Sequence, residues 1–347
     1  MTPPTQPAVR RALEHHARYA RNPSSLVAID DRIELFETPG VTGSIPYRVV
    51  GRAWVAGEPL APADALPDLL RAFLVQARRA GRTAILAPVG PAVRTVAVHL
   101  GLLAVHLGEA SYLDPRHWAP RGNRYARLRN DMNRAARQGV RVREVHGPDA
   151  ELRAALRTLA RRWLAGRRAG TGLDWIFQLD PAQHPGLKRT FVATAPDGTL
   201  LAFVSASPLP GRRGWYLEDV VRDERSPRGT AASVVAHALQ TFGAEGASSV
   251  TLGGVPLTGH AGRLHLRFLR PVVARWYHVD GLQHFKAQFG ADDREDEWLI
   301  VPSVTALPLA AWAVLRLAVP GPLWPLAQPL WTPPGQTRRT LSPSPVS

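Results

Sequence analysis

The chain has 347 residues, and its 43 Lys and Arg against 28 Asp and Glu give a formal net charge of +15. A hydrophobic fraction of 45% is enough to build cores and excludes a wholly disordered chain, while the absence of cysteine excludes disulfides, thiolate metal sites and a cysteine nucleophile. The length fits two domains, and the positive charge favours a polyanionic partner, either nucleic acid or an anionic membrane surface.

The first residues lack the basic start and apolar core of a signal peptide, so a cytoplasmic location is expected. Strand-like and helix-like stretches then alternate, which predicts an α/β or α+β fold. The predicted elements are, in chain order, a β-rich stretch, an amphipathic helix, a short strand, a second strand, a second amphipathic helix and a third strand: 44–55, 68–79, 83–87, 140–145, 152–163 and 215–221. Both Pro-rich ends are expected to be disordered tails.

The first amphipathic helix has an internal counterpart later in the chain. A constant offset in residue number pairs apolar positions with apolar positions: Leu69, Leu70, Phe73, Leu74 and Ala77 with Val234, Val235, Ala238, Leu239 and Phe242. Each half then has the order strand, loop, helix, glycine and strand, which is the core of the acetyltransferase-like (GNAT) fold. We therefore expect a tandem GNAT-like protein with two similar halves.

Four regions follow from this division of the chain. They are an N-terminal tail and helix, a degenerate GNAT-like domain, a catalytic GNAT-like domain, and an apolar and then Pro-rich C-terminal tail: 1–21, 22–145, 146–302 and 303–347. The second half is expected to carry the site, because it has Asp219 where the first half has Trp54. The first half is expected to be structural, with Trp54 buried.

Asp219 is predicted at the end of a strand whose alternating residues Trp215, Leu217 and Val221 indicate an inward face. A carboxylate on that face is costly unless it is used or paired. The alternatives are an ion pair with Arg222 or a turn contact. Glu218, on the opposite face, is the rival carboxylate.

The loop after this strand leads to a helix N-terminus, where anions bind. Acetyltransferases of this fold hold the coenzyme A pyrophosphate on such a loop. In the equivalent segment, 226–231, Gly229 fits the pattern but Ser226 does not, and Pro227 lacks a donor N–H. Coenzyme A binding is weakened but stays open, since Arg225 or Arg228 can supply charge, and an ordinary helix N-terminus is the alternative.

The segment 121–143 carries eight arginines and a single acid, Asp131. Arg127, Arg134 and Arg137 fall near one face of a helix, so contacts with phosphate groups are geometrically possible. A solvated helix face is the alternative. Because so many like charges repel one another without an anionic partner, we expect this segment to contact tRNA or lipid headgroups.

Several motifs occur in a fixed order: Asp219-x-x-Arg222, Pro227-Arg228-Gly229-Thr230, 252–259, and Phe285-Lys286-Ala287-Gln288-Phe289, with 47–50, 57–59 and 127–134 upstream. In order and spacing they resemble the C-terminal domain of bacterial phosphatidylglycerol lysyltransferases, over residues 22–302. The resemblance implies an aminoacyl-tRNA-dependent acyltransferase that moves an amino acid to a hydroxyl of a membrane lipid, usually phosphatidylglycerol. It implies peripheral binding at the inner membrane face and no cofactor beyond the aminoacyl-tRNA donor.

The resemblance also implies site residues. Asp219 would be the proton acceptor or the anchor for the donor's ammonium, and Lys286 the positive group near the oxyanion. The implied substrate-binding residues are Arg222, Arg228, Gly229, Thr230, Arg127, Arg129, Asn130, Asn133 and Arg134. The alternative for Lys286 is a surface lysine whose stem packs on its neighbours. No metal is expected, because no His-Glu-x-x-His or comparable ligand pattern occurs.

One departure concerns 296–299, where the family tends to have Pro-Arg-Tyr-Leu and this chain has Asp296-Glu297-Trp298-Leu299. The charge at the arginine position is reversed, so the resemblance does not identify the amino acid that is transferred. The apolar stretch 304–331 either packs in the core or anchors at a bilayer interface, and it is too short and interrupted to span a membrane. The alternative functions are an acyl-coenzyme A-dependent N-acyltransferase and a non-catalytic basic tRNA- or membrane-binding module.

Overall fold

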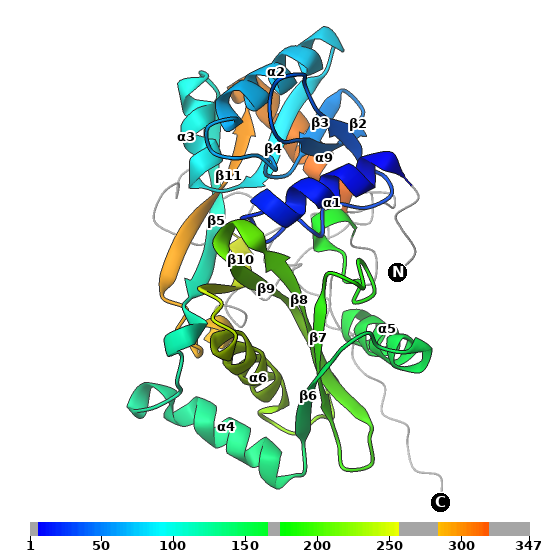
Figure 1. The fold of residues 1–347 in the computed structure, drawn as a ribbon, viewed down its shortest axis with the longest axis vertical. Helices are drawn as coiled ribbons and strands as arrows, with labels where there is room; N and C mark the ends of the chain where they lie inside the picture. The colour runs from blue at the N-terminus through cyan, green and yellow to red at the C-terminus, as the bar shows by residue number, and fades with distance from the viewer. Residues whose placement is uncertain (1–5, 166–173, 257–283, 319–347) are drawn as a thin grey trace, which may run out of the picture.

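The computed structural model describes residues 6–165, 174–256 and 284–318 (Figure 1). Within these ranges the strands form one mixed sheet of eleven, in the order β1-β2-β3-β4-β11-β5-β10-β9-β8-β7-β6. The strands are β1 Glu34–Phe36, β2 Ile45–Val50, β3 Ala53–Ala56, β4 Thr83–Val89, β5 Leu103–Leu113, β6 Arg141–Val145, β7 Arg189–Thr194, β8 Leu200–Leu209, β9 Gly214–Arg222, β10 Ser249–Pro256 and β11 Asp293–Val301.

Helices cover both halves of the sheet, with α2 and α3 in the upper part of Figure 1 and α4, α5 and α6 in the lower part. The helices are α1 Pro7–Tyr19, α2 Leu66–Arg79, α3 Pro91–His99, α4 Ala126–Arg137, α5 Ala150–Ala165, α6 Thr230–Ala244 and α9 Leu307–Ala318. Short 3₁₀ turns occur at η1 Pro115–His117, η2 Asn123–Tyr125, η3 Trp175–Phe177, η4 Pro210–Arg212 and η5 Val304–Ala306. In the described ranges no helix has the length and apolarity needed to cross a bilayer.

The predicted offset, which carries Leu69 to Val234, relates the elements of the two halves. The offset matches the residues of α2 with those of α6 and the residues of β4 with those of β10. In both halves the strand before the helix pairs in parallel with the strand after it. Gly81 and Gly246 follow the two helices with φ of 66° and 82°, where glycine is favoured. The expected α/β fold with two similar halves is confirmed.

The last strand of each half lies in the sheet of the other half. Strand β11 pairs with β4, β5 pairs with β10, and the two exchanged strands pair antiparallel with each other. The sheet of each half therefore contains one strand from the other.

A β-bulge occurs at the equivalent position of each half. In β10, Leu252 and Gly253 stand opposite the single Ser111 of β5, because the register shifts between Thr251 and Gly254. In β4, residues 87 and 88 stand opposite Leu299 of β11. The offset that relates the two helices also relates the two bulges.

Apolar residues of α2 and α6 form the two main cores against one face of the sheet. Trp54 is 8% exposed, so the prediction that it is buried is confirmed. A third core lies under α9, where Ala310 and Ala313 pack with Val55 and Ile85. One face of α9 is thus core packing, whereas Val304 and Trp312 are exposed, and 319–331 lie outside the described residues.

Candidate functional site

Strand β9 has a bulge at the predicted catalytic aspartate. Glu218 and Asp219 stand together opposite Ser205 of β8, because the register shifts between the flanking pairs. The strand continues to Arg222, so Asp219 lies within it and not at its end as predicted. The side chain of Asp219 is outside the described part of the structure.

The bulge also changes which residues face the core. Leu217 packs in the α6 core, whereas Val221 packs under α5 on the other face of the sheet. The prediction that Trp215, Leu217 and Val221 share one inward face is therefore wrong, because an extra residue in a strand inverts the alternation beyond it.

Glu218, the rival carboxylate, is held in a buried ion pair. Lys188 Nζ lies 2.9 Å from Glu218 Oε2, and the Ser207 hydroxyl donates to the other carboxylate oxygen. Lys188 and Lys286 are the only lysines of the chain, and both are buried. The contacts of Glu218 thus fix the bulge that contains Asp219.

Lys286 lies on a helical turn at 284–287 and reaches the bulge of β10. Its Nζ donates hydrogen bonds to the carbonyl oxygens of Gly253 at 2.8 Å and of Gly254 at 3.0 Å, and the residue is only 6% exposed. Successive carbonyls of a regular strand point in opposite directions, and the bulge lets two of them accept from one ammonium. The surface-lysine alternative for Lys286 is therefore wrong.

The two glycines of the bulge leave space that neighbouring side chains occupy. Gly253 has φ of 80°, and a Cβ there would collide with the ring of Tyr216. A Cβ on Gly254 would collide with the carboxylate of Glu297 from β11. Lys286, Tyr216 and Glu297 thus meet at this bulge, which we call the β10 bulge site.

Carboxylates of both halves surround this site. Burial raises the pKa of Glu297 to about 7, and the charge of Lys286 opposes that rise. Burial also raises the pKa of Glu58, whose Oε2 accepts from the Gly90 N–H at 2.7 Å. Glu295, by contrast, forms a bidentate ion pair with Arg212, whose Nη1 lies 2.7 Å from Glu295 Oε1.

The sequence did not indicate Glu58, Glu295 or Arg212 as members of a site. They come together only because β5 and β11 are exchanged between the halves. For Glu297 a signal was present in the sequence, namely the charge reversal within 296–299.

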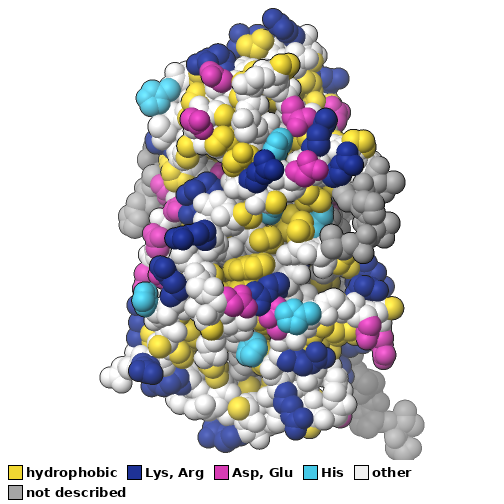
Figure 2. Space-filling view, viewed as in Figure 1, with side chains coloured by type: hydrophobic (Ala, Val, Ile, Leu, Met, Phe, Trp, Pro, Cys, Tyr) yellow, Lys and Arg dark blue, Asp and Glu magenta, His cyan; other side chains and the backbone are white. Residues whose placement is uncertain are grey.

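The predicted phosphate-binding residues of α4 lie on its exposed side, while Leu128 and Ala135 are buried. The exposed residues are Arg127, Asn130, Asn133, Arg134 and Arg137. Arg127 Nη1 lies 3.2 Å from His284 Nε2, two residues before Lys286. The helix α4 therefore borders the segment that carries Lys286. In Figure 2, Lys and Arg side chains are spread over both halves of the face shown, including its lower part, where α4 lies.

Arg129 has a different environment from the exposed arginines of α4. Its Nη1 donates to the carbonyl oxygens of Pro120 at 3.0 Å and Gly122 at 2.7 Å. These contacts fix the turn before the helix.

The predicted anion-binding loop lies under α4. Gly229 precedes α6 with φ of 95°, and a Cβ there would collide with the Asp131 carbonyl of α4. Arg228 Nε lies 2.9 Å from an Asp131 carboxylate oxygen, and the buried Thr230 hydroxyl donates to the Pro227 carbonyl at 2.7 Å. The glycine of this loop thus permits the close approach of α4, and Arg222 is exposed at the end of β9.

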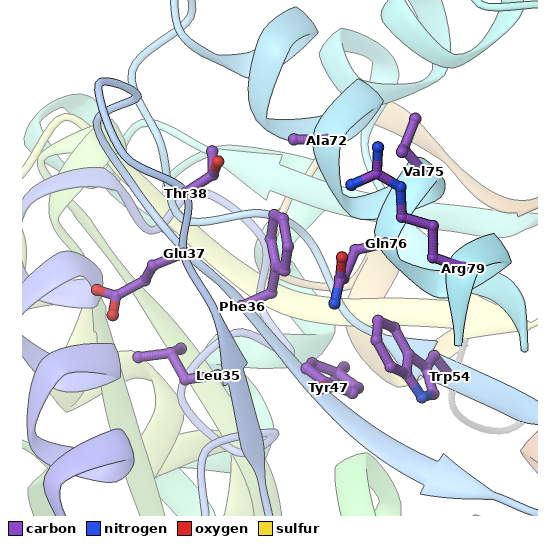
Figure 3. Close-up of a pocket in the computed structure, with 10 residues that line it drawn as sticks. All are labelled: Leu35, Phe36, Glu37, Thr38, Tyr47, Trp54, Ala72, Val75, Gln76 and Arg79. Carbon is purple, nitrogen blue, oxygen red and sulfur yellow. The ribbon is translucent and has the colours of Figure 1, made fainter.

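The first half has a pocket of about 460 Å³ between β1, β3 and α2 (Figure 3). Figure 3 shows Gln76 and Arg79 of α2 near the aromatic side chains of Phe36, Tyr47 and Trp54. The rings of Tyr47 and Trp54 pack with centroids 4.6 Å apart. Where the second half has Asp219, the first half therefore has packed aromatic rings.

Among the residues that the structure describes, no group of three or more His, Asp or Glu side chains is placed to hold a metal ion.

Comparison with known proteins identifies the family to which this chain is similar. The family model described as phosphatidylglycerol lysyltransferase, C-terminal, matches residues 11–301. The lysylphosphatidylglycerol biosynthesis bifunctional protein LysX of Nocardia farcinica is 26% identical over 321 residues, which are 84% of this chain and 27% of that protein. The chain thus spans about a quarter of this curated relative.

Two solved structures share the fold. The C-terminal domain of a lysylphosphatidylglycerol synthetase from Agrobacterium fabrum has a TM-score of 0.79 at 23% identity, with 91% of this chain and 98% of that chain covered. L-PGS from Bacillus licheniformis has a TM-score of 0.75 at 21% identity, with 91% and 97% covered.

Proposed function

The chain belongs to the phosphatidylglycerol lysyltransferase C-terminal family, and on that premise we propose that it transfers an amino acid from aminoacyl-tRNA to a hydroxyl of a membrane lipid such as phosphatidylglycerol. The observation that carries the proposal is the position of Lys286, whose ammonium is held by the carbonyls of Gly253 and Gly254. The name of the curated relative describes lysylphosphatidylglycerol biosynthesis, which supports this class of reaction.

The proposed reaction exchanges one ester for another. The lipid hydroxyl oxygen attacks the carbonyl carbon of the aminoacyl ester, and the bond from that carbon to the terminal ribose oxygen of the tRNA breaks. The proton of the attacking hydroxyl ends on the ribose oxygen that leaves. The bonds formed and broken and the proton are thus accounted for without a cofactor, and none is proposed.

The ester is already activated, so the protein has to add orientation, a proton acceptor and a positive group near the developing oxyanion. We assign the positive group to Lys286, because its ammonium is fixed at the β10 bulge site. We assign the proton acceptor to Asp219, which lies in the bulge of β9.

The exposed arginines of α4 are proposed to bind phosphates of tRNA or of the lipid surface. They border the Lys286 segment through the contact of Arg127 with His284. The same charge supports peripheral association with the anionic inner face of the membrane. A coenzyme A donor is disfavoured, because α4 covers Gly229 in the loop that would hold its pyrophosphate.

The reaction is tested with radiolabelled aminoacyl-tRNA and phosphatidylglycerol vesicles, followed by lipid extraction and thin-layer chromatography. We expect a labelled lipid product from the unaltered chain. The variants Lys286→Met and Asp219→Asn should each lower its rate at least about 30-fold, because oxyanion and proton-transfer contributions are of this size or larger.

The control is Arg71→Gln, which removes an exposed charge from α2 in the first half and should leave the rate unchanged. A folded Lys286→Met protein that keeps the full rate would remove that residue from the mechanism. If no aminoacyl-tRNA of a full set gives a lipid product, while tRNA still binds, the binding-module alternative holds.

A further inference from the structure

Glu297 differs from the carboxylates around it in its partners. Arg212 neutralises Glu295, and the Gly90 N–H donates to Glu58. Glu297 forms no ion pair with any residue in the described ranges, although the charge of Lys286 acts on it, and its hydrogen-bond partner is the neutral side chain of Asn22. A carboxylate this enclosed is costly, because the charge of Lys286 offsets only part of the effect of burial, and a further cation would lower that cost.

The strand pairing directs the side chain of Glu297 toward the β10 bulge site. Its partner on the neighbouring β5 is Gly108, so no β5 side chain stands in its path at that register position. Its carboxylate lies against Gly254 on the far side of β5, and Lys286 acts on it electrostatically. Glu297 as a residue is only partly buried, so it keeps some contact with solvent.

Glu297 places a negative charge beside the ammonium of Lys286, which is proposed to meet the donor's carbonyl oxygen. A negative charge at that place favours a donor group that is itself positive.

We infer that Glu297 is a specificity-determining residue that binds a primary ammonium of the aminoacyl donor at the β10 bulge site. This inference rests on the proposed function. In an aminoacyl ester the α-ammonium and the carbonyl oxygen are borne by adjacent carbon atoms, so the neighbouring Glu297 and Lys286 can hold one each. A lysyl ester offers a second ammonium on its side chain, and the experiment separates these two sources.

The test uses a 3′-aminoacylamino analogue of adenosine, in which an amide replaces the ester so that no transfer occurs. Three forms carry an alanyl, a lysyl or an N-acetylalanyl group, and calorimetry measures their binding to the whole chain. We expect Glu297→Gln to weaken binding of the lysyl form, which carries both ammonium groups, about 10- to 100-fold, the usual contribution of a hydrogen bond to a charged group. Binding of the N-acetylalanyl form should not change.

The comparison of the alanyl and lysyl forms identifies the ammonium. An equal loss for both assigns Glu297 to the α-ammonium, and a loss confined to the lysyl form assigns it to the side chain. The matched control is Asp296→Asn, the preceding residue of β11, whose carboxylate lies 2.9 Å from His106 Nε2. This control should bind all three forms as the unaltered chain does.

The pH dependence gives a second readout. The charged and polar groups around Glu297 are Lys286, Glu58, Glu295, Tyr112 and Asn22, with Arg212 behind Glu295. A carboxylate with a pKa of about 7 ionises as the pH rises from 6 to 7.5, so binding of the lysyl form should strengthen roughly eight-fold over that interval. Glu297→Gln should abolish this rise.

The inference is overturned if the unaltered chain does not bind the charged forms, or if folded Glu297→Gln binds them equally well. It is also overturned if the variant loses the charged and the acetylated forms to the same extent. Because the analogues bind without turnover, failure of the proposed reaction is separable: a chain that binds them through Glu297 but makes no lipid product contradicts only the transfer.

Discussion

At the level of single residues, His16 links the fold to pH. It is 1% exposed on α1, and its Nε2 has no hydrogen-bond partner among the described residues. Burial, together with the nearby charge of His184, lowers its pKa to about 4. The unfolded chain therefore binds this proton more tightly than the folded protein, so the stability from neutral His16 is full above about pH 6.5 and is lost as the pH falls toward 4.

We expect this one residue to remove about 2 to 3 kcal/mol from the free energy of unfolding between pH 7 and pH 4. Urea unfolding of the unaltered chain and of His16→Leu across this range measures the effect. The variant should lose less stability on acidification by that amount. Parallel plots of unfolding free energy against pH for the two proteins would show that His16 has the same pKa in the folded and the unfolded chain.

A substitution at Gly229 tests the contact between α4 and the N-terminus of α6. Alanine at this position has to adopt φ of 95° and displace the Asp131 carbonyl, so Gly229→Ala should cost at least about 2 kcal/mol. The matched control is Gly198→Ala, which has φ of 88° but open space around a Cβ. Thermal unfolding should show a clearly larger loss for Gly229→Ala, and equal losses would mean that α4 is not fixed at this position.

At the level of elements, α4 is a predicted binding surface whose exposed arginines contribute little to the fold. Replacing Arg127, Arg134 and Arg137 by Gln should weaken tRNA or anionic-vesicle binding and flatten its salt dependence by about 0.7 to 0.9 for each phosphate that the helix no longer neutralises. Equilibrium binding at several salt concentrations measures this slope. Stability should hardly change, because surface substitutions are usually neutral.

Arg129 provides the contrast on the same helix. Arg129→Gln removes the hydrogen bonds to the Pro120 and Gly122 carbonyls and should lower the melting temperature. If the triple variant keeps the full salt slope for both ligands, α4 is not part of the binding surface.

The elements also show how far the sequence predicts this fold. Apolar periodicity is local, so the constant offset between the halves locates α2, α6, β4 and β10. The bulges of β9 and β10 are not local, because they depend on the register with β8 and β5. The alternation of 215–221 thus gives the wrong face for Val221. Lys286 is found from its motif, but the carbonyls that hold it follow only from the bulge.

At the level of the whole molecule, the exchange of strands makes each half depend on the other. Strand β5 separates β10 from β11, and it supplies Tyr112, whose ring lies under the Arg212 guanidinium at 4.5 Å. The β10 bulge site takes Gly253 and Lys286 from the second half, while the register that aims Glu297 at it comes from β5 of the first. The two predicted domains, 22–145 and 146–302, are therefore expected to behave as one folding unit.

This dependence predicts the behaviour of a fragment. A chain of residues 146–347 lacks β5, so β10 and β11 lose their shared partner, and it lacks α4, which packs on Gly229. Unpaired strand edges and an uncovered core favour aggregation over folding. We expect the fragment alone to aggregate or to lack a cooperative thermal transition, and co-expression with residues 1–145 to restore a soluble complex. Size-exclusion chromatography and circular dichroism distinguish these outcomes, and a fragment that stays monomeric and unfolds cooperatively would show that the exchanged strand is dispensable.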